Sequence, residues 1–285
     1  MALIVEAPAK VNLFLHVTGR RADGYHLLDS LVVFARCGDT LTFEPADELT
    51  LELDGPTAGL LADGDNIVLK AAYALAKAAG VTRGARIRLT KRLPVAAGVG
   101  GGSADAAAAL TGLSRLWDIE VPLQHLALSL GADVPVCLKG VPTAMSGVGE
   151  GLADAPTLPP AWLVLVNPGV PLSTPAVFKA RRGGFSAADP LTEAPADAKA
   201  LADALARRRN ELTEAALSLA PVVGEVLAKL AATRGCLLAR MSGPGATCFG
   251  LYAGEAEARG AAASLRGSGW WVEAAQLLRR GVRQQ

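Results

Sequence analysis

A glycine-dense segment between Leu93 and Ala106 leads directly into an alanine-rich stretch. Gly100, Gly101 and Gly102 lack a Cβ, so the backbone here can bend sharply and bring its N–H groups close to a ligand. A helix that begins just after these glycines adds unpaired N–H donors and the positive end of its dipole. The segment therefore predicts a binding site for phosphate.

Three interpretations of these glycines must be compared. A Walker A loop requires a lysine after its last glycine, and this sequence has none. A dinucleotide-binding loop requires GxGxxG, but Ser103 stands at the third glycine, and the ribose-binding acid would have to be Asp118 or Glu120. The third interpretation is a turn that only packs a helix against a sheet.

Two charged residues lie at positions where either a structural or a functional role is open. Lys10 begins an apolar strand after Pro8, where it could face a phosphoryl group or be an ordinary exposed lysine. Asp133 lies between Gly131 and Pro135, where it could be a functional carboxylate or serve only as a turn or cap residue. The residue types alone leave both alternatives open.

The elements that would position these residues follow from hydrophobic periodicity. Period-two alternation over 11–17 predicts a strand, and Asn66 precedes a helical pattern that ends at Gly80. We expect Ser103 to cap the helix after the glycines and Asp105 to stabilise its first turn. Further strands are predicted at 31–34, 40–43, 49–53, 86–90 and 143–145, and a short helix at 123–130.

A stretch rich in Gly and Pro, 147–160, indicates the boundary between two domains, 1–155 and 156–285. We expect 183–195 to be an exposed loop and the three arginines at 207–209 to be solvated. The second half is predicted to contain a strand at 163–166, helices at about 198–219 and 222–233, a strand–glycine–strand unit at 241–249, a helix at 255–265 and a strand at 270–274.

Composition argues against several classes of function. The net charge of +1, without a basic stripe, does not suit a nucleic-acid partner. No stretch reaches about 18 apolar residues, and the N-terminus does not resemble a signal peptide. The four cysteines lack CxxC spacing and the three histidines lack metal-ligand spacing. We expect a cytoplasmic protein with reduced thiols, a monomer or weak homodimer, that acts on a small molecule and not on a membrane.

Five segments, in order, resemble the GHMP kinases, the superfamily of galactokinase, homoserine kinase, mevalonate kinase and phosphomevalonate kinase. The match runs from residue 8 to about residue 250, and the five segments together are far more specific than any one alone. They are PAKVNLFL (8–15), RADGYH (21–26), PVAAGVGGGS (94–103), LGADVPV (130–136) and SGPGA (242–246).

The resemblance implies an α+β fold with two domains: an ATP-binding domain of the ribosomal protein S5 domain 2-like type, then a ferredoxin-like domain on the substrate side. It also implies ATP- and Mg²⁺-dependent phosphorylation of a cytidyl-bearing alcohol in isoprenoid precursor synthesis. The alternatives are another GHMP kinase of the homoserine or mevalonate type, a dinucleotide-binding oxidoreductase, and an inactive nucleotide-binding module.

The resemblance assigns roles to the charged and aromatic residues. Lys10 faces the transferring phosphoryl group, and Asp133 is the catalytic carboxylate that accepts the hydroxyl proton. Tyr25 is expected to stack on the cytosine of the acceptor, and His26 to hydrogen-bond its edge. The complete set of expected substrate contacts is Asn12, Tyr25, His26 and Thr174.

The same resemblance places ATP on the glycine segment, with Asn66 near the adenosine or serving as a helix cap, and Lys91 near the base. Many relatives have two adjacent serines where this chain has Ser103 and Ala104, so Ser103 is the best candidate protein ligand for the metal, with Asp105 reaching it through water as the alternative to a helix-stabilising role. Pro244 stands where relatives have Ser or Thr, which removes one backbone N–H. The expected ATP-binding residues are Asn66, Lys91, Pro94, Val95, Ala96, Ala97, Gly98, Val99, Gly100, Gly101, Gly102, Ser103 and Ala104.

Overall fold

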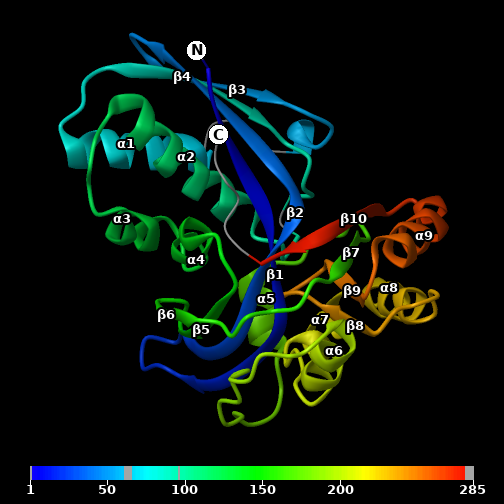
Figure 1. Cartoon of the computed structure of the whole chain (residues 1–285). Helices are drawn as coiled ribbons and strands as arrows, with labels where there is room; N and C mark the ends of the chain where they lie inside the picture. The colour runs from blue at the N-terminus through cyan, green and yellow to red at the C-terminus, as the bar shows by residue number, and fades with distance from the viewer. Residues whose placement is uncertain (1, 61–65, 96, 280–285) are drawn as a thin grey trace.

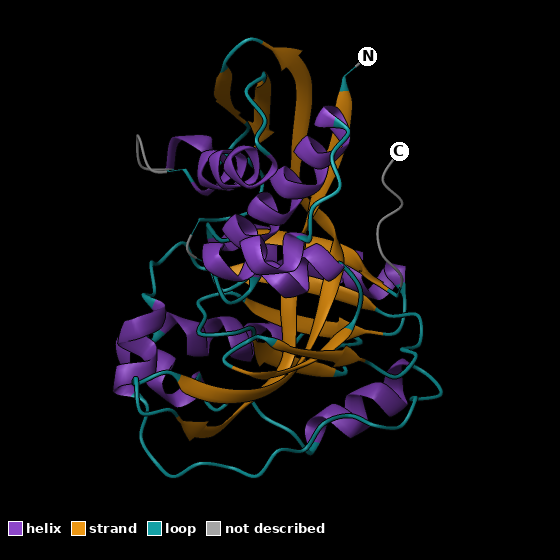
Figure 2. Ribbon diagram, turned by 90° about the vertical axis from the view of Figure 1, so that its left-hand side faces the viewer, coloured by secondary structure: helices purple, strands orange, loops and turns teal. Residues whose placement is uncertain are grey.

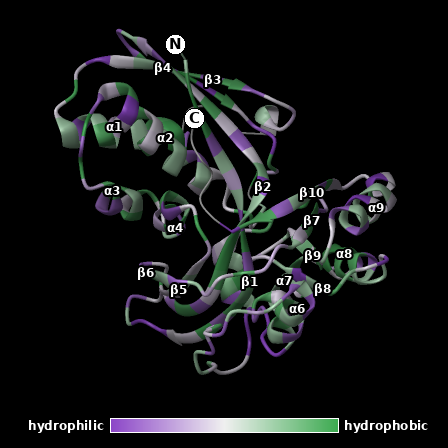
Figure 3. Ribbon diagram, in the orientation of Figure 1, coloured by the Kyte–Doolittle hydropathy of each residue, from purple (hydrophilic) through white to green (hydrophobic). Residues whose placement is uncertain are grey.

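A long two-stranded ribbon forms the spine of the computed structural model, which describes residues 2–60, 66–95 and 97–279. Its antiparallel strands are β1 (Leu3–Arg20) and β2 (His26–Ala46). The ribbon runs through the whole molecule in Figure 1 and links its two halves. The middle of β1 is buried on both faces, and its green colouring in Figure 3 marks this apolar run.

The prediction of two separate strands at 31–34 and 40–43 is wrong, because both belong to β2. The polar residues around Gly38 indicated a break between them. In the structure Gly38 lies opposite Pro8, and a Cβ at this position would lie 2.7 Å from Pro8 Cα. Glycine therefore permits the two backbones to approach closely and keeps β2 continuous.

The N-terminal half adds strands and helices to this ribbon. They are β3 (Leu49–Asp54), the 3₁₀ turn η1 (Ala58–Leu60), α1 (Ile67–Ala79), β4 (Gly84–Thr90), α2 (Gly101–Trp117), α3 (Leu123–Leu130), α4 (Val134–Lys139), β5 (Thr143–Gly147) and β6 (Gly151–Asp154). Strands β4 and β5 both pair with β2, β3 runs parallel to β4, and β6 pairs with β5. The four helices share one apolar core with β1, β2 and β4, so they form a layer on the sheet (Figure 2).

The C-terminal half is a second sheet with its own helices. Its elements are β7 (Trp162–Asn167), α5 (Thr174–Ala180), α6 (Ala198–Ala206), α7 (Thr213–Leu219), α8 (Val222–Ala231), β8 (Leu238–Met241), β9 (Cys248–Tyr252), α9 (Glu255–Leu265), the 3₁₀ turn η2 (Arg266–Ser268) and β10 (Trp271–Leu278). The strands are antiparallel in the order β10-β7-β9-β8, and the end of β10 also pairs with β2. Helices α7, α8 and α9 pack on one face of this sheet, while α6 packs on the other.

The single helix predicted at about 198–219 is wrong, because α6 and α7 are separate. The segment 207–212 between them lies along β1 instead: Leu15 N–H donates to Arg209 O over 3.0 Å, and Glu211 N–H donates to Leu15 O over 2.9 Å. These tertiary hydrogen bonds outweigh local helix propensity. The expectation that the three arginines are solvated also fails for Arg208, which is only 8% exposed.

Other local predictions have mixed outcomes. The helices expected after Asn66, at 123–130 and at 255–265 are confirmed as α1, α3 and α9, whereas β6 was not predicted. Ser103 does not cap α2, because the helix begins at Gly101 with Gly100 at the N-cap. Asp105 does not stabilise a helix end, because its carboxylate is buried against Lys91.

The α+β fold class is confirmed, and the expected domain boundary at 155/156 falls between β6 and β7. All four cysteines lie within the described residues and are free thiols. Among the helices that the structure describes, none combines the length and the apolar character that crossing a membrane requires.

Candidate active site

A cleft of about 1470 Å³ lies between the two halves and contains most of the predicted site residues. Its walls come from β1, the glycine segment, α5 and the turn around Pro244. A concave pocket on which polar and charged groups converge is the usual form of a small-molecule site. Its lining includes both the glycines and residues of α5, so the same cleft contains a candidate anion site and a candidate aromatic site.

Lys10 and Asp133 meet in this cleft. Lys10 lies where the register of β1 against β2 shifts, just after Pro8. Its Nζ lies 2.9 Å from Asp133 Oδ2 and donates a second hydrogen bond of 2.9 Å to Asn12 Oδ1. The Lys10 side chain is 4% exposed whereas that of Asp133 is 36% exposed. The carboxylate is therefore the member of the pair that a ligand in the cleft can reach directly.

The glycine segment opens on the cleft with free donors. Gly98 and Gly100 have left-handed backbone conformations, with φ of 73° and 62°. The first hydrogen bond of α2 is from Ala104 N–H to Gly100 O, 2.8 Å, so the amides of Gly101, Gly102 and Ser103 precede the hydrogen-bonded turns. Gly100 has no side chain that could cap them. This arrangement suits an anion at the start of a 17-residue helix.

Lys91 lies beneath this segment, and two buried carboxylates hold its ammonium. Lys91 Nζ donates to Asp39 and, over 2.6 Å, to Asp105 Oδ2. Burial would lower the pKa of Lys91, but the two carboxylates outweigh it and raise that pKa. Burial raises the pKa of Asp105 to about 7 although Lys91 opposes the shift. A Cβ at Gly101 would lie 3.1 Å from Lys91 Nζ, so this cluster supports the glycines from below.

The other end of the cleft is aromatic and cationic. Tyr25 is 65% exposed, and the His26 ring stacks on Phe178 of α5, with centroids 4.9 Å apart and planes 19° apart. Burial, together with the charges of Arg20 and Arg181, lowers the pKa of His26. An exposed aromatic ring beside a stacked imidazole is suited to a nucleobase.

The structure brings most of the expected residues together, with some exceptions. Val99 and Ala104 are 1% and 2% exposed and belong to the apolar core, and they do not line the cleft. Ala96 lies outside the described residues. Asn66 caps α1 by accepting from Val68 N–H over 2.8 Å and also lines the cleft. The expected residues that line the cleft are Lys10, Asn12, Tyr25, His26, Asn66, Lys91, Pro94, Val95, Ala97, Gly98, Gly100, Gly101, Gly102, Ser103, Asp133 and Thr174.

Sequence reasoning missed several residues of this site. Phe178 carried no signal because an aromatic residue in a short helix is normally interpreted as core. Asp39 lies in β2, 52 positions from Lys91, and Arg20 is the last residue of β1, paired with His26 across the turn that contains Tyr25. Among the residues described, no group of three or more His, Cys, Asp or Glu side chains could hold a metal ion.

Comparison with known families defines the class of protein. Residues 66–141 match the family described as "GHMP kinases N terminal domain", and residues 191–269 match "GHMP kinases C terminal". The first match covers the glycine segment and Asp133, and the second covers the Ser242–Ala246 turn. Fold and site together are those of a GHMP kinase.

Individual relatives identify the branch. A protein of Paramagnetospirillum magneticum, named 4-diphosphocytidyl-2-C-methyl-D-erythritol kinase, is 70% identical over 96% of this chain and 98% of its own. One of Rhodospirillum rubrum with the same name is 59% identical over 97% and 93% of the two chains. A crystal structure titled 4-(cytidine 5'-diphospho)-2C-methyl-D-erythritol kinase is 39% identical over 96% and 98%, with a TM-score of 0.82. The chain belongs to the family of 4-diphosphocytidyl-2-C-methyl-D-erythritol kinases.

Proposed function

We propose that this chain transfers the γ-phosphoryl group of ATP to the 2-hydroxyl of 4-diphosphocytidyl-2-C-methyl-D-erythritol, a step in the non-mevalonate route to isoprenoid precursors. The observation that carries this proposal is the placement of the Lys10–Asp133 pair in one cleft with the glycine segment and the aromatic site. The relatives at 50–70% identity, all with this name, support it and do not favour a homoserine or mevalonate kinase or an oxidoreductase.

The donor half of the reaction relies on the glycine segment. The N–H groups at the start of α2 would bind the phosphates of ATP, and residues 94–103 would wrap around them. Lys10 would stabilise the charge of the transferring group, because phosphoryl transfer depends mainly on positioning and charge neutralisation. Asn66 lines the cleft near this end and would lie beside the adenosine.

The acceptor half relies on Asp133. Its carboxylate would accept the proton of the 2-hydroxyl while that oxygen forms a bond to the γ-phosphorus. The bond between that phosphorus and the bridging oxygen of ADP breaks, and ADP leaves with the electron pair. Lys10 would hold Asp133 in place through the 2.9 Å ion pair.

The cytidyl group would lie at the aromatic end of the cleft. Tyr25 and Phe178 would stack on the base and ribose side, and His26 would hydrogen-bond the edge of the base. Thr174, the first residue of α5, would contact the acceptor from the second half of the chain. Asn12 would act on the methylerythritol end, although Lys10 and Ser30 already occupy its two amide atoms at 2.9 and 2.7 Å.

The oxygen atoms near the glycine segment fit Mg²⁺. Ser103 lines the cleft, and Asp105 Oδ1 is a buried carboxylate oxygen without a hydrogen-bond partner. Mg²⁺ prefers oxygen ligands and usually retains several waters beside substrate phosphates, so one hydroxyl and one carboxylate suit it. Ser103 would hold the ion, and the bound ion would neutralise part of the charge on the phosphates.

An assay with the purified protein tests the proposed function directly. The protein is incubated with γ-labelled ATP and, separately, 4-diphosphocytidyl-2-C-methyl-D-erythritol, homoserine or mevalonate. We expect label transfer only to the cytidyl acceptor, with competition by CDP. Transfer to another acceptor, or NAD(P) binding without any transfer, would reject the assignment.

The same proposal includes a cytoplasmic monomer or weak homodimer. In it, residues 1–155 bind ATP and residues 156–285 complete the acceptor site.

A further inference from the structure

A single serine hydroxyl joins the glycine segment to the strand that carries Lys10. Ser242, which precedes the Gly243–Gly245 turn, is fully buried. Its Oγ accepts a hydrogen bond from Asn12 N–H over 3.1 Å and donates one to Gly98 O over 3.1 Å. The hydroxyl thus uses both its donor and an acceptor position to connect two segments that are far apart in sequence.

Each end of this connection is part of the site. Asn12 Oδ1 accepts from Lys10 Nζ, so the residue that Ser242 holds is the residue that orients the lysine. Gly98 is the first left-handed glycine of the phosphate segment. A Cβ at Gly98 would lie 2.8 Å from Ser242 O and 2.5 Å from Gly245 O, so the two turns already touch. A displacement of Ser242 would therefore move both the phosphate segment and the support of Lys10.

Asn210 holds Ser242 in place. Its Nδ2 donates to Met241 O and Gly243 O, both over 2.8 Å, and these are the carbonyls on either side of Ser242. Its Oδ1 accepts from Leu212 N–H over 3.0 Å. Both N–H donors of the carboxamide and its oxygen are therefore in use, and this residue, 6% exposed, acts as a clamp on the residues that flank the serine.

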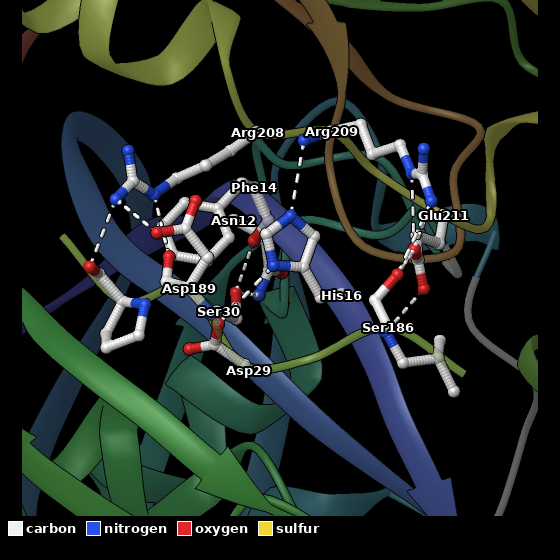
Figure 4. Close-up of polar contacts among 12 residues, drawn as sticks. Asn12, Phe14, His16, Asp29, Ser30, Ser186, Asp189, Arg208, Arg209 and Glu211 are labelled. Carbon is white, nitrogen blue, oxygen red and sulfur yellow. Dashed lines mark hydrogen bonds and ion pairs between the residues drawn. The ribbon is translucent and has the colours of Figure 1, made fainter.

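The segment that carries Asn210 is itself fixed to β1 (Figure 4). Glu211 accepts from Val17 N–H over 2.8 Å and from Arg209, while Arg208 pairs with Asp189 over 2.9 Å. This network and the backbone hydrogen bonds to Leu15 hold 207–212 along β1, where Asn210 contacts the Met241–Gly243 backbone. The clamp is thus attached to the same strand that carries Lys10.

We propose that Ser242 is a positioning residue that couples the ATP phosphate segment to Lys10, and that Asn210 holds it for this purpose. The proposal rests on the proposed function for its chemistry, but it makes a separate claim about ATP binding that holds for any acceptor. Neither residue lines the cleft, so both act through the residues that do.

The test compares Ser242→Ala with a matched control, Ser264→Ala, which removes only a local 2.7 Å hydrogen bond to Ala261 O in α9. We expect Ser242→Ala to lower kcat by about 10- to 100-fold, because displacements of about 1 Å at a reacting centre have effects of this size. We expect its Kd for ATP, measured without acceptor, to rise several-fold, and its affinity for CDP to stay within about 3-fold of wild type. Ser264→Ala should match wild type in all three measurements.

Asn210→Asp provides the second variant, because it keeps the size and the acceptor for Leu212 while removing both donors. We expect it to raise the Kd for ATP as Ser242→Ala does, and the double variant to be no worse than the poorer single variant, since both act as one unit. Folded Ser242→Ala or Asn210→Asp with wild-type kcat and ATP affinity would overturn the proposal, and so would equal losses in ATP and CDP binding. If wild-type protein failed to phosphorylate the cytidyl acceptor, only the proposed function would fall, since ATP binding is measured without it.

Discussion

Lys10 and Asp133, 123 positions apart in sequence, form an ion pair of 2.9 Å in which the lysine is buried and the aspartate faces the cleft. This asymmetry suits the different tasks proposed for the two groups. A buried ammonium held by Asp133 and Asn12 has a fixed position, which suits stabilisation of charge on a phosphoryl group. A carboxylate that is one-third exposed is open to a substrate hydroxyl, which suits proton transfer.

Asp133→Asn should therefore abolish turnover while the fold is retained. The amide keeps the shape of the carboxylate but cannot accept the hydroxyl proton, and we expect kcat to fall by roughly 10²- to 10⁴-fold. Binding of CDP and of ATP should change by less than about 10-fold, since neither depends on the proton transfer. Steady-state kinetics with the cytidyl acceptor, together with thermal unfolding, measure both effects.

Asp154→Asn is the matched control, because Asp154 also pairs with a lysine but is 93% exposed at its side chain. It should leave kcat unchanged, as exposed ion pairs contribute little. A turnover rate of Asp133→Asn within about 3-fold of wild type would contradict general-base catalysis by this residue, because such catalysis contributes at least ~100-fold.

A second prediction concerns His26. Burial and the charges of Arg20 and Arg181 lower the pKa of this imidazole, which favours the neutral form that the proposed hydrogen bond to the base edge would use. Arg20→Gln should raise the pKa of His26 toward 6.5, and it should weaken CDP binding because the cleft loses a positive charge that would attract a phosphorylated ligand. An NMR titration of the His26 ring and a CDP titration measure these two effects.

Arg182→Gln is the control that tests whether the loss of any positive charge in this region has the same effect on His26 and on CDP binding. Arg182 is exposed and its guanidinium contacts only the backbone of Lys179 and Arg181 among the residues described. We expect it to leave the pKa of His26 and the affinity for CDP close to wild type. A His26 pKa that is the same in Arg20→Gln and wild type would show that burial alone sets it.

Local patterns predicted much of the site. The glycines at 98–102 were identified from their backbone freedom, whereas Lys10 and Asp133 received their roles from the resemblance of five ordered segments to a known family. The cleft that joins these segments is consistent with those predictions, and the Lys10–Asp133 contact agrees with the expected pair. Motifs of this kind specify chemistry locally, so the sequence suffices to find them.

Long-range pairing explains the rest. The segment 207–212 had helical periodicity on both sides, and only its hydrogen bonds to Leu15 show that it lies along β1. Asp39 and Phe178 acquire their roles from Lys91 and His26, which lie 52 and 152 positions away. The tertiary fold brings such partners together, and no short stretch of the sequence contains both residues of either pair.

Glu211 should stabilise the folded protein at neutral pH and lose this contribution in acid. Burial would raise its pKa, but hydrogen bonds from Ser186, Val17 N–H and Arg209 outweigh burial and lower the pKa to about 2. A carboxyl whose pKa is depressed in the folded state stabilises the fold above its unfolded pKa, and this contribution is lost as pH falls toward 2. Glu211→Gln should therefore lower the free energy of unfolding at pH 7 by up to about 3 kcal/mol.

Urea unfolding between pH 3 and pH 7 checks this prediction. The wild-type free energy of unfolding should decline as pH falls below about 4.5, and the difference between wild type and Glu211→Gln should shrink over the same window. A difference that stays constant from pH 7 to pH 3 would mean that Glu211 contributes through shape and not through its charge.

Asp105 should give the free energy of unfolding the opposite dependence on pH. Burial raises its pKa to about 7, so the folded state holds a proton that the unfolded state has released above about pH 4. Stability from such a group is present at low pH and is lost as pH rises through about 7. Asp105→Asn keeps a neutral side chain beside Lys91 at every pH, so its stability relative to wild type should increase from pH 5 to pH 7 by about 2 kcal/mol and then level off.

Thermal or urea unfolding of both proteins at pH 5, 6, 7 and 8 measures this difference. Asp39 remains to balance Lys91 in the variant, because it accepts from the same ammonium and also from Arg92 N–H and Leu93 N–H, at 2.6 and 2.9 Å. The support beneath Gly101 is therefore retained, and the pH-dependent part of the difference can be assigned to the Asp105 proton. A difference that is flat across this range, or that falls as pH rises, would show that Asp105 is ionised in the folded protein at pH 5 and that Lys91 outweighs its burial.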